Sequence, residues 1–260
     1  MNRIHIVGVN PRTGTTLMAE CMRLCFDIAC WEPHEASLRR LRRCKGVYLT
    51  KTPYEIEHVG MRLRLDPRFH VICMVRDPRD VVVSRHGGQP DKYWRHTSLR
   101  LFRARWAIAQ QWLDHPRFML VRFEDLIEQP DRVQERIAAR FPFLVRTGDF
   151  SSFHQRGDVS EPSRLALNGV RPIDAANRAK WRSHATRLEQ QLQESGPIDA
   201  ELLALGYETD ADWTTRHGIA ADPAIVPRPV RPKGGFRRRA AVAVSAMLAG
   251  LFARLGINIG

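Results

Sequence analysis

The sequence predicts an α/β fold built as a three-layer sandwich, with helices on both faces of a central parallel sheet. Short apolar runs alternate with helical patterns, as is typical of parallel strands joined by crossover helices. The chain has 260 residues, of which 43% are hydrophobic, and this is enough to bury a substantial core. The strand candidates are residues 3–9, 28–31, 47–50, 69–75 and 117–122.

The first strand candidate leads into the most informative segment of the chain. Residues 4–9 form a mostly apolar run, and residues 10–16 read Asn-Pro-Arg-Thr-Gly-Thr-Thr. Apolar residues at helical spacing follow, so we expect a helix that begins near Thr15. The unpaired N–H groups and the positive dipole end of such a helix attract an anion. This order of strand, loop and helix is typical of a phosphate-binding loop, and it predicts a P-loop-like fold.

The spacing within this loop argues against a nucleoside-triphosphate kinase. Triphosphate loops place four residues between two glycines and a lysine directly after the second glycine. Here five residues separate Gly8 from Gly14, and Thr15 follows. The cation of the loop is instead Arg12, two residues before Gly14. The sequence therefore predicts an anion site that differs from a triphosphate site.

Charged side chains follow the first four strand candidates. They are Arg12, Glu32, Lys51 and Arg76. Functional groups in open parallel sheets gather at the carboxyl ends of the strands. We therefore expect these four side chains to lie along one edge of the sheet.

Two segments resemble the donor site of a known enzyme family. Residues 11–16 resemble the 5′-phosphosulfate loop of sulfotransferases that use 3′-phosphoadenosine 5′-phosphosulfate (PAPS). Residues 71–84, an apolar run, an Arg-Asp-Pro turn and a helix start, resemble the 3′-phosphate segment of the same family. The likeness covers about residues 3–210 and is closest in its motifs to tyrosylprotein and heparan-type enzymes. It implies transfer of a sulfuryl group from PAPS to an acceptor hydroxyl, without a metal.

The resemblance also implies roles for individual residues. The implied donor contacts are Arg12, Thr13, Gly14, Thr15 and Thr16 at the 5′-phosphosulfate, Arg76 and Ser84 at the 3′-phosphate, and Arg178 and Lys180 over the nucleotide. Arg12 and Lys51 are implied catalytic cations, on the leaving phosphate and on the sulfuryl oxygens. Structural alternatives stay open at this point. They are a simple helix cap for Thr15, a solvated turn for Lys51, pairing of Arg76 with Asp77 or Asp80, and a solvated helix face for Arg178.

A general base must take the proton of the acceptor hydroxyl. Residues 29–35 resemble the region in which tyrosylprotein sulfotransferases carry their catalytic glutamate. Glu32 fits best by position and is the predicted catalytic base. His34 and Glu35 are close enough in sequence to remain alternatives.

The cysteines and the N-terminus predict a cytoplasmic enzyme. The five cysteines form no Cys-x-x-Cys pair and no cluster at zinc-ligand spacing, so we expect buried free thiols in a reducing cytosol and no metal. No signal peptide precedes the first strand candidate, so we expect the protein to stay in the cytoplasm or at the inner face of the membrane.

The last part of the chain forms a separate basic unit. After Asp222 there are seven basic residues and no acidic ones, and removing these seven from the net charge of +13 leaves +6 for residues 1–222. We predict a sulfotransferase domain at 1–221, a Pro/Gly-rich linker at 222–235 and a basic-apolar helix at 236–260. The apolar run of this helix is too short to span a bilayer. Three alternatives stay open for this helix: it lies on an anionic membrane surface, it packs on the catalytic domain, or it inserts into the membrane, which is the least favoured of the three.

The acceptor and the class of protein leave three hypotheses open. We favour a hydroxyl on a glycan or glycolipid, with a peptide tyrosine as the alternative acceptor. The alternative from another class is a non-enzymatic basic module that binds nucleic acid or an anionic membrane. Much of the positive charge lies in the tail and no nucleic-acid motif is present, so we expect no nucleic-acid partner.

Overall fold

The computed structural model describes residues 1–86, 89–94, 96–174, 178–226 and 236–259. Its centre is a five-stranded sheet in the order β2-β3-β1-β4-β7, in which every neighbouring pair is parallel. The strands are β1 (Asn2–Gly8), β2 (Cys30–Trp31), β3 (Val47–Thr52), β4 (Phe69–Val75) and β7 (Phe118–Arg122). The predicted α/β fold with a central parallel sheet is confirmed.

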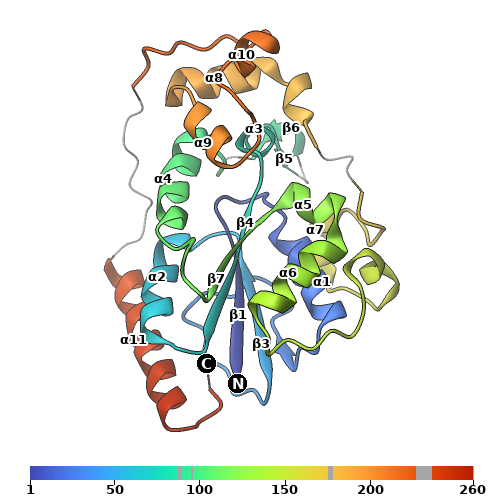
Figure 1. Ribbon diagram of the computed structural model, residues 1–260, viewed down its shortest axis with the longest axis vertical. Coiled ribbons are helices and arrows are strands. Elements are labelled where there is room, and N and C mark those ends of the chain that lie inside the picture. The colour runs from blue at the N-terminus through green and yellow to red at the C-terminus, as the bar shows by residue number, and fades with distance from the viewer. Residues whose placement is uncertain (87–88, 95, 175–177, 227–235, 260) are drawn as a thin grey trace.

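Alternation along the strands buries both faces of the sheet. Ile4 and Ile6 of β1 face one helical layer, whereas Val7 faces the other, because successive strand side chains point to opposite faces. The first layer contains α1 (Thr15–Cys25), α5 (Phe123–Glu128), α6 (Pro130–Arg140), η1 (Phe150–Gln155) and α7 (Glu161–Leu167). The second contains α2 (Ile56–Leu65), α4 (Leu99–Gln110) and α11 (Phe236–Arg254). Figure 1 shows these layers on the two sides of the sheet.

A third cluster lies beyond the carboxyl ends of the strands (Figure 1). Its elements are α3 (Pro78–Val82), η2 (Lys180–Ser183), α8 (Ala185–Ser195), α9 (Asp199–Ala204) and α10 (Trp213–Arg216), beside the antiparallel pair β5 (Arg85–His86) and β6 (Gln89–Tyr93). Arg79 of α3 contacts two other elements of this cluster. Its guanidinium pairs with Asp77 and lies 4.4 Å from the ring of Trp181 in η2 and 4.9 Å from the ring of Trp213 in α10. The cluster therefore covers the edge of the sheet where the charged residues were predicted.

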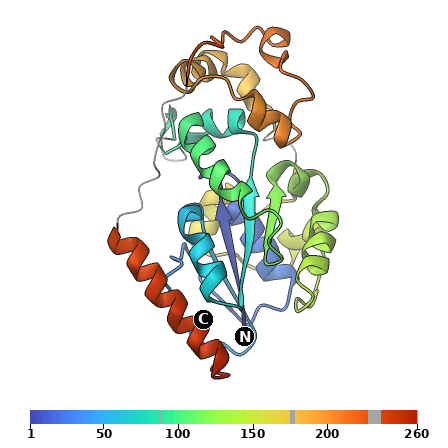
Figure 2. The same cartoon turned by 60° about the vertical axis from the view of Figure 1, so that its left-hand side comes forward.

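The C-terminal helix α11 packs along α2, as Figures 1 and 2 show. Gly250 permits the close approach, since a Cβ there would lie 2.2 Å from the carbonyl oxygen of Leu65. Arg62 donates to Ser245 at 2.8 Å, and Arg238 pairs with Glu55 at 2.6 Å. Packing on the domain is thus the observed alternative for this segment. Among the described residues, no helix is long and apolar enough to cross a membrane.

The predicted division into a domain at 1–221, a linker at 222–235 and a terminal helix at 236–260 stays a prediction. Residues 227–235 of the linker, and Gly260, lie outside the described residues. 

The expectation of five free thiols is wrong for two cysteines. Cys30 and Cys44 form a disulfide that closes the segment between β2 and β3. Their spacing in the sequence gave no sign of this, because it is the parallel pairing of β2 with β3 that brings the two ends of the segment together. The other three cysteines are free and buried, as expected. Burial raises the pKa of Cys25 to about 11, so this thiol stays protonated near neutral pH.

Candidate functional site

The loop between β1 and α1 has the geometry of a phosphate cradle. Helix α1 begins at Thr15, as predicted, and its N-cap is Gly14 with φ 84°. No side chain caps this end, so Thr15 is not the helix cap. The first intrahelical N–H bond runs from Met18 to the Gly14 oxygen at 3.0 Å, which leaves the N–H groups of residues 15–17 ahead of it. These groups and the helix dipole provide an anion site.

Two glycines let the loop fold tightly. A Cβ on Gly14 would lie 2.4 Å from a ring carbon of Phe123, and a Cβ on Gly8 would lie 2.4 Å from the Asn10 oxygen. Thr13 is buried, and its hydroxyl donates to the Asn10 oxygen at 2.9 Å. The hydroxyl of Thr13 therefore stabilises the loop from inside, so its predicted donor contact can come only from the backbone.

Lys51 lies beside the start of α1. Its Nζ donates to the Thr16 hydroxyl at 3.0 Å, and the residue is buried, so it is not a solvated turn lysine. The parallel pairing of β3 with β1 brings it there, with Lys51 opposite Ile6. Burial lowers the pKa of Lys51, against the opposing charges of Glu35 and Glu20. The structure thus joins two predicted site residues, Lys51 and Thr16.

Arg12, Arg76 and Ser84 come together on the other side of the loop. Arg76 follows β4 and donates to the Arg12 carbonyl oxygen at 3.3 Å, while its guanidinium lies 4.7 Å from the Phe123 ring. Arg12 donates to the Ser84 hydroxyl at 3.0 Å. Arg12 is exposed, yet desolvation by its neighbours and repulsion from Arg76 lower its pKa. Because the two guanidinium groups repel each other, an anion that contacts both of them is favoured.

Asp80 is a residue of the site whose main role the sequence did not reveal. It is buried, lies 3.6 Å from Arg76, and accepts the N–H groups of Ala179 at 2.9 Å and Trp181 at 3.0 Å. The predicted pairing of Arg76 with Asp80 is therefore real, but Asp80 also holds the segment around Lys180 against α3. Burial raises the pKa of Asp80, with Arg76 opposing that shift.

The two basic residues predicted to cover the nucleotide are placed differently. The backbone around Lys180 is fixed at the carboxyl end of the sheet by Asp80. Arg178 is exposed and forms an ion pair with Glu128, the last residue of α5. Asp80, which also pairs with Arg76, thus holds the backbone on both sides of Lys180, whereas the Arg178 side chain is directed to Glu128.

The predicted base Glu32 is held by three side chains. Its carboxylate accepts from Tyr48 at 2.7 Å and pairs with Arg42 at 3.3 Å and Arg40 at 3.5 Å. Burial alone would raise the pKa of Glu32, but the Tyr48 hydrogen bond and the two arginines outweigh it and lower the pKa. A carboxylate stabilised in this way has little tendency to take a proton.

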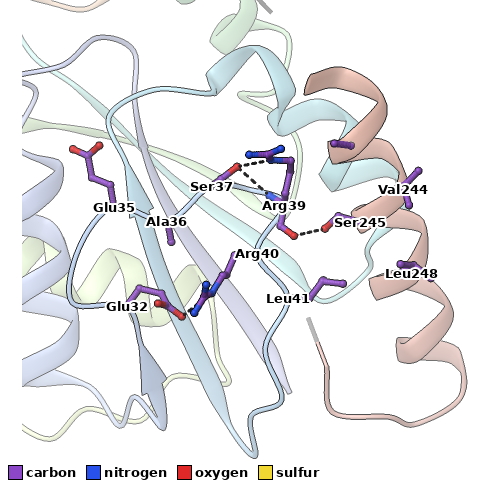
Figure 3. Close-up of a pocket in the computed structure, with 11 residues that line it drawn as sticks. Glu32, Glu35, Ala36, Ser37, Arg39, Arg40, Leu41, Val244, Ser245 and Leu248 are labelled. Carbon is purple, nitrogen blue, oxygen red and sulfur yellow. Dashed lines mark hydrogen bonds and ion pairs between the residues drawn. The ribbon is translucent and has the colours of Figure 1, made fainter. Parts of the chain in front are cut away.

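Glu35 has a different environment. It is exposed, and within the described part of the chain no hydrogen bond or ion pair engages its carboxylate. Its charge acts on Lys51 and on Tyr54, whose pKa is raised first by burial and then by Glu35. Figure 3 shows the Glu35 side chain directed away from the pair formed by Glu32 and Arg40. His34 is exposed as well.

No group of three or more His, Cys, Asp or Glu side chains that could hold a metal ion occurs among the residues that the structure describes.

Comparison with known proteins identifies a family for part of the chain. Residues 29–146 match the model of a family described as the sulfotransferase family. The matched segment includes Glu32, Lys51, Arg76 and Ser84, and it begins after the phosphate loop. The resemblance to sulfotransferases is confirmed by this match. 

One similar solved structure is the sulfotransferase domain from the Synechococcus PCC 7002 olefin synthase. It has 16% sequence identity and a TM-score of 0.48, and the comparison covers 70% of this chain and 88% of that domain. No curated protein matches the chain.

Proposed function

Starting from a segment that matches the sulfotransferase family, we propose that this chain transfers the sulfuryl group of PAPS to an acceptor hydroxyl on a glycan or glycolipid. The observation that carries the proposal is the convergence of Arg12, Arg76 and Ser84 beside the N-terminus of α1. Arg76 has a carboxylate partner in Asp80 at 3.6 Å, whereas no carboxylate among the described residues pairs with Arg12, whose pKa is lowered by burial and by repulsion from Arg76. An added anion is therefore favoured there. A nucleotide with phosphates at both the 3′ and the 5′ position supplies two such anions, and forked guanidinium groups suit them.

The donor's two anionic ends are assigned to the two sides of the loop. The 5′-phosphosulfate is bound by the N–H groups at the start of α1, by Thr15 and Thr16, and by Lys51. The 3′-phosphate is bound by Arg76 and Ser84. Support comes from their placement on either side of the residue 10–14 loop. Gly14 lets the phosphate approach the backbone closely.

Sulfuryl transfer is expected to resemble phosphoryl transfer, with a loose, in-line transition state. The acceptor oxygen bonds to sulfur while the bond from sulfur to the bridging oxygen breaks, and that bond's electron pair leaves with adenosine 3′,5′-bisphosphate. Fixed cations stabilise the charge that develops on the leaving phosphate. Arg12 is assigned this role because a guanidinium keeps its proton at neutral pH in spite of its lowered pKa. Lys51 is assigned the role of binding the sulfuryl oxygens through its ammonium group.

We assign the role of general base, which takes the proton of the acceptor hydroxyl, to Glu35 in preference to Glu32. Glu35 is exposed, and its charge acts on Lys51, which in turn donates to Thr16. Glu32 is occupied by Tyr48 and two arginines, and its pKa is lowered. Its role in this proposal is to hold the segment that carries Glu35.

The experiment is a matched pair of variants, Glu35→Gln and Glu32→Gln. Turnover is measured as PAPS consumed and adenosine 3′,5′-bisphosphate formed in the presence of a screened acceptor. We expect Glu35→Gln to lower turnover about 10²-fold while binding of the bisphosphate is unchanged. Glu32→Gln should act mainly on stability. Full activity of Glu35→Gln with loss of activity in Glu32→Gln would return the role of base to Glu32.

We propose a peripheral location at the cytoplasmic face of an anionic membrane, with α11 as the contact. The absence of acidic residues after Asp222 and the basic residues there support it. The Cys30–Cys44 disulfide is the observation against a reducing compartment, because disulfides persist mainly in oxidising ones. Fractionation of the native host, with the redox state of this pair measured by alkylation, decides between the two locations.

A further inference from the structure

Helix α11 carries two apolar faces, of which only one is covered. Val242, Ala246 and Ala249 are fully buried on the side of α2. The second face is exposed, with side chains 41–62% accessible. It consists of Val244, Met247, Leu248 and Leu251 of α11 and of Leu255, the residue directly after the helix. Steps of three and four residues place these five on one continuous stripe, which we call the outer stripe.

A groove runs along one side of this stripe. Its volume is about 640 Å³, and it lies between α11 and residues 32–41, as Figure 3 shows. Ala241, Val244 and Leu248 form its apolar wall. Val244 and Leu248 therefore belong to both the outer stripe and the groove.

The groove is built by specific contacts. Ser245 of α11 donates to the Arg39 carbonyl oxygen at 2.9 Å, and Arg62 donates to the same serine. Arg3, fully buried, donates to the Arg40 carbonyl oxygen at 2.6 Å. Glu55 accepts the Leu38 N–H at 2.8 Å. The helix and the segment thus have a fixed register, and the groove between them keeps its shape.

One wall of the groove leads to the proposed chemistry. Glu35 lines it, and the charge of Glu35 acts on Lys51, which donates to Thr16 at the start of α1. Ala36, which also lines the groove, donates its backbone N–H to the Lys51 carbonyl oxygen at 2.9 Å, so the groove wall at residues 35–36 lies beside the strand that carries Lys51. An acceptor that fits this groove has a long apolar part and a hydroxyl-bearing head.

The charges around the groove indicate where such a molecule comes from. Residues 236–259 contain four arginines and no acidic residue, and Arg39 and Arg40 lie on the opposite wall. Arg238 pairs with Glu55 and Arg40 with Glu32, whereas no carboxylate among the described residues pairs with Arg39, Arg237, Arg239 or Arg254. A cationic rim around an apolar stripe complements the surface of an anionic bilayer.

We propose that the groove binds the alkyl chain of a lipid-linked acceptor taken from an anionic membrane, with the acceptor hydroxyl directed toward Glu35 and Lys51. This inference rests on the proposed sulfotransferase function and narrows its acceptor from glycans in general to hydroxyl-bearing amphiphiles. The outer stripe contacts the membrane, and the groove receives one molecule from it.

The test uses alkyl β-glucosides of increasing chain length, each below its micellar concentration, and calorimetry with the full chain. Each methylene that enters the groove should tighten binding about fourfold, from ~0.8 kcal/mol per CH₂ and ~1.4 kcal/mol per factor of ten. Leu248→Asp, in the groove, should abolish this dependence on chain length. Met247→Asp, on the outer stripe but outside the groove, should retain it. Equal affinity for methyl, hexyl and octyl glucosides in the unmodified protein would overturn the inference, as would an unchanged slope in Leu248→Asp.

A second experiment distinguishes a membrane from a second copy of the chain as the partner of the outer stripe. Sedimentation with vesicles of phosphatidylglycerol and phosphatidylcholine should be reduced at least tenfold by Met247→Asp. If the protein is instead a dimer by light scattering that Met247→Asp converts to monomer, a second copy covers the stripe and the membrane source is refuted. Binding of adenosine 3′,5′-bisphosphate is measured in every variant. Normal nucleotide binding without a chain-length effect refutes the groove alone, whereas absent nucleotide binding in the unmodified protein refutes the proposed function.

Discussion

Replacing Gly14 by alanine should damage both the fold and the proposed phosphate site. Gly14 has φ 84°, a left-handed conformation that costs an L-residue about 1–2 kcal/mol. The new Cβ would also lie 2.4 Å from a ring carbon of Phe123, and the face of that ring supports Arg76 at 4.7 Å. Phe123 must therefore move, and Arg76 moves with it. We expect a total loss of about 2–5 kcal/mol in the free energy of unfolding, because overpacking adds about 1–3 kcal/mol to the backbone cost.

A matched control separates the two effects. Gly218 has φ 63°, and a Cβ there would meet nothing within 4 Å. Gly218→Ala should therefore show the backbone cost alone, in urea unfolding, and should bind adenosine 3′,5′-bisphosphate normally. Gly14→Ala should be less stable than this control and should bind the nucleotide at least tenfold more weakly. Truncation of the ring in Gly14→Ala/Phe123→Ala should remove the clash, but it also removes the contact between the ring and Arg76. Equal stability and equal nucleotide affinity of Gly14→Ala and Gly218→Ala would refute this explanation.

Two further predictions concern stability. Burial lowers the pKa of His70 from 6.5 to about 4, so the unfolded chain binds more protons between these values, and stability should fall by about 3 kcal/mol as the pH drops from 7 to 4. His70→Phe, which keeps the aromatic contacts, should reduce that pH dependence in urea unfolding, and an identical pH profile would exclude His70 as its source. The Cys30–Cys44 disulfide closes a segment of 14 residues and should contribute about 3 kcal/mol. Addition of dithiothreitol should lower the urea midpoint of the unmodified protein and leave that of Cys30→Ser/Cys44→Ser unchanged, whereas an effect on both would show that another group responds.

The sequence predicted best where local pattern and topology act together. The first strand, the loop and the start of α1 at Thr15 could be predicted because apolar alternation and glycine spacing are local signals. Lys51 could be placed beside the loop because carboxyl ends of parallel strands share an edge. 

Features that depend on long-range partners could not be predicted. Glu32 has the right position after its strand, but its carboxylate is held by Tyr48 and two arginines that only the tertiary fold supplies. Asp80 holds the backbone of residues 179 and 181, about a hundred positions away in the chain. 

The position of the C-terminal segment, residues 236–260, also could not be predicted from the sequence. A short apolar run with flanking arginines fits membrane contact and domain packing equally well from sequence alone. The structure shows that one face of α11 packs on α2 while the outer stripe stays exposed, because apolar residues surround the helix on both sides. The two alternatives are therefore compatible, a conclusion that composition could not supply.

The central claim is recognition of a 3′-phosphate by Arg76 and Ser84, and calorimetry tests it most directly. Adenosine 3′,5′-bisphosphate is compared with adenosine 5′-monophosphate, which lacks only the 3′-phosphate. We expect the bisphosphate to bind about 10–150-fold more tightly, as ~1.5–3 kcal/mol for a hydrogen bond to a charged group implies. Ser84→Ala should reduce this preference and Arg76→Ala should abolish it, while Arg136→Ala, an exposed arginine on α6, should keep it. Equal affinity of the folded, unmodified protein for the two nucleotides would contradict the account.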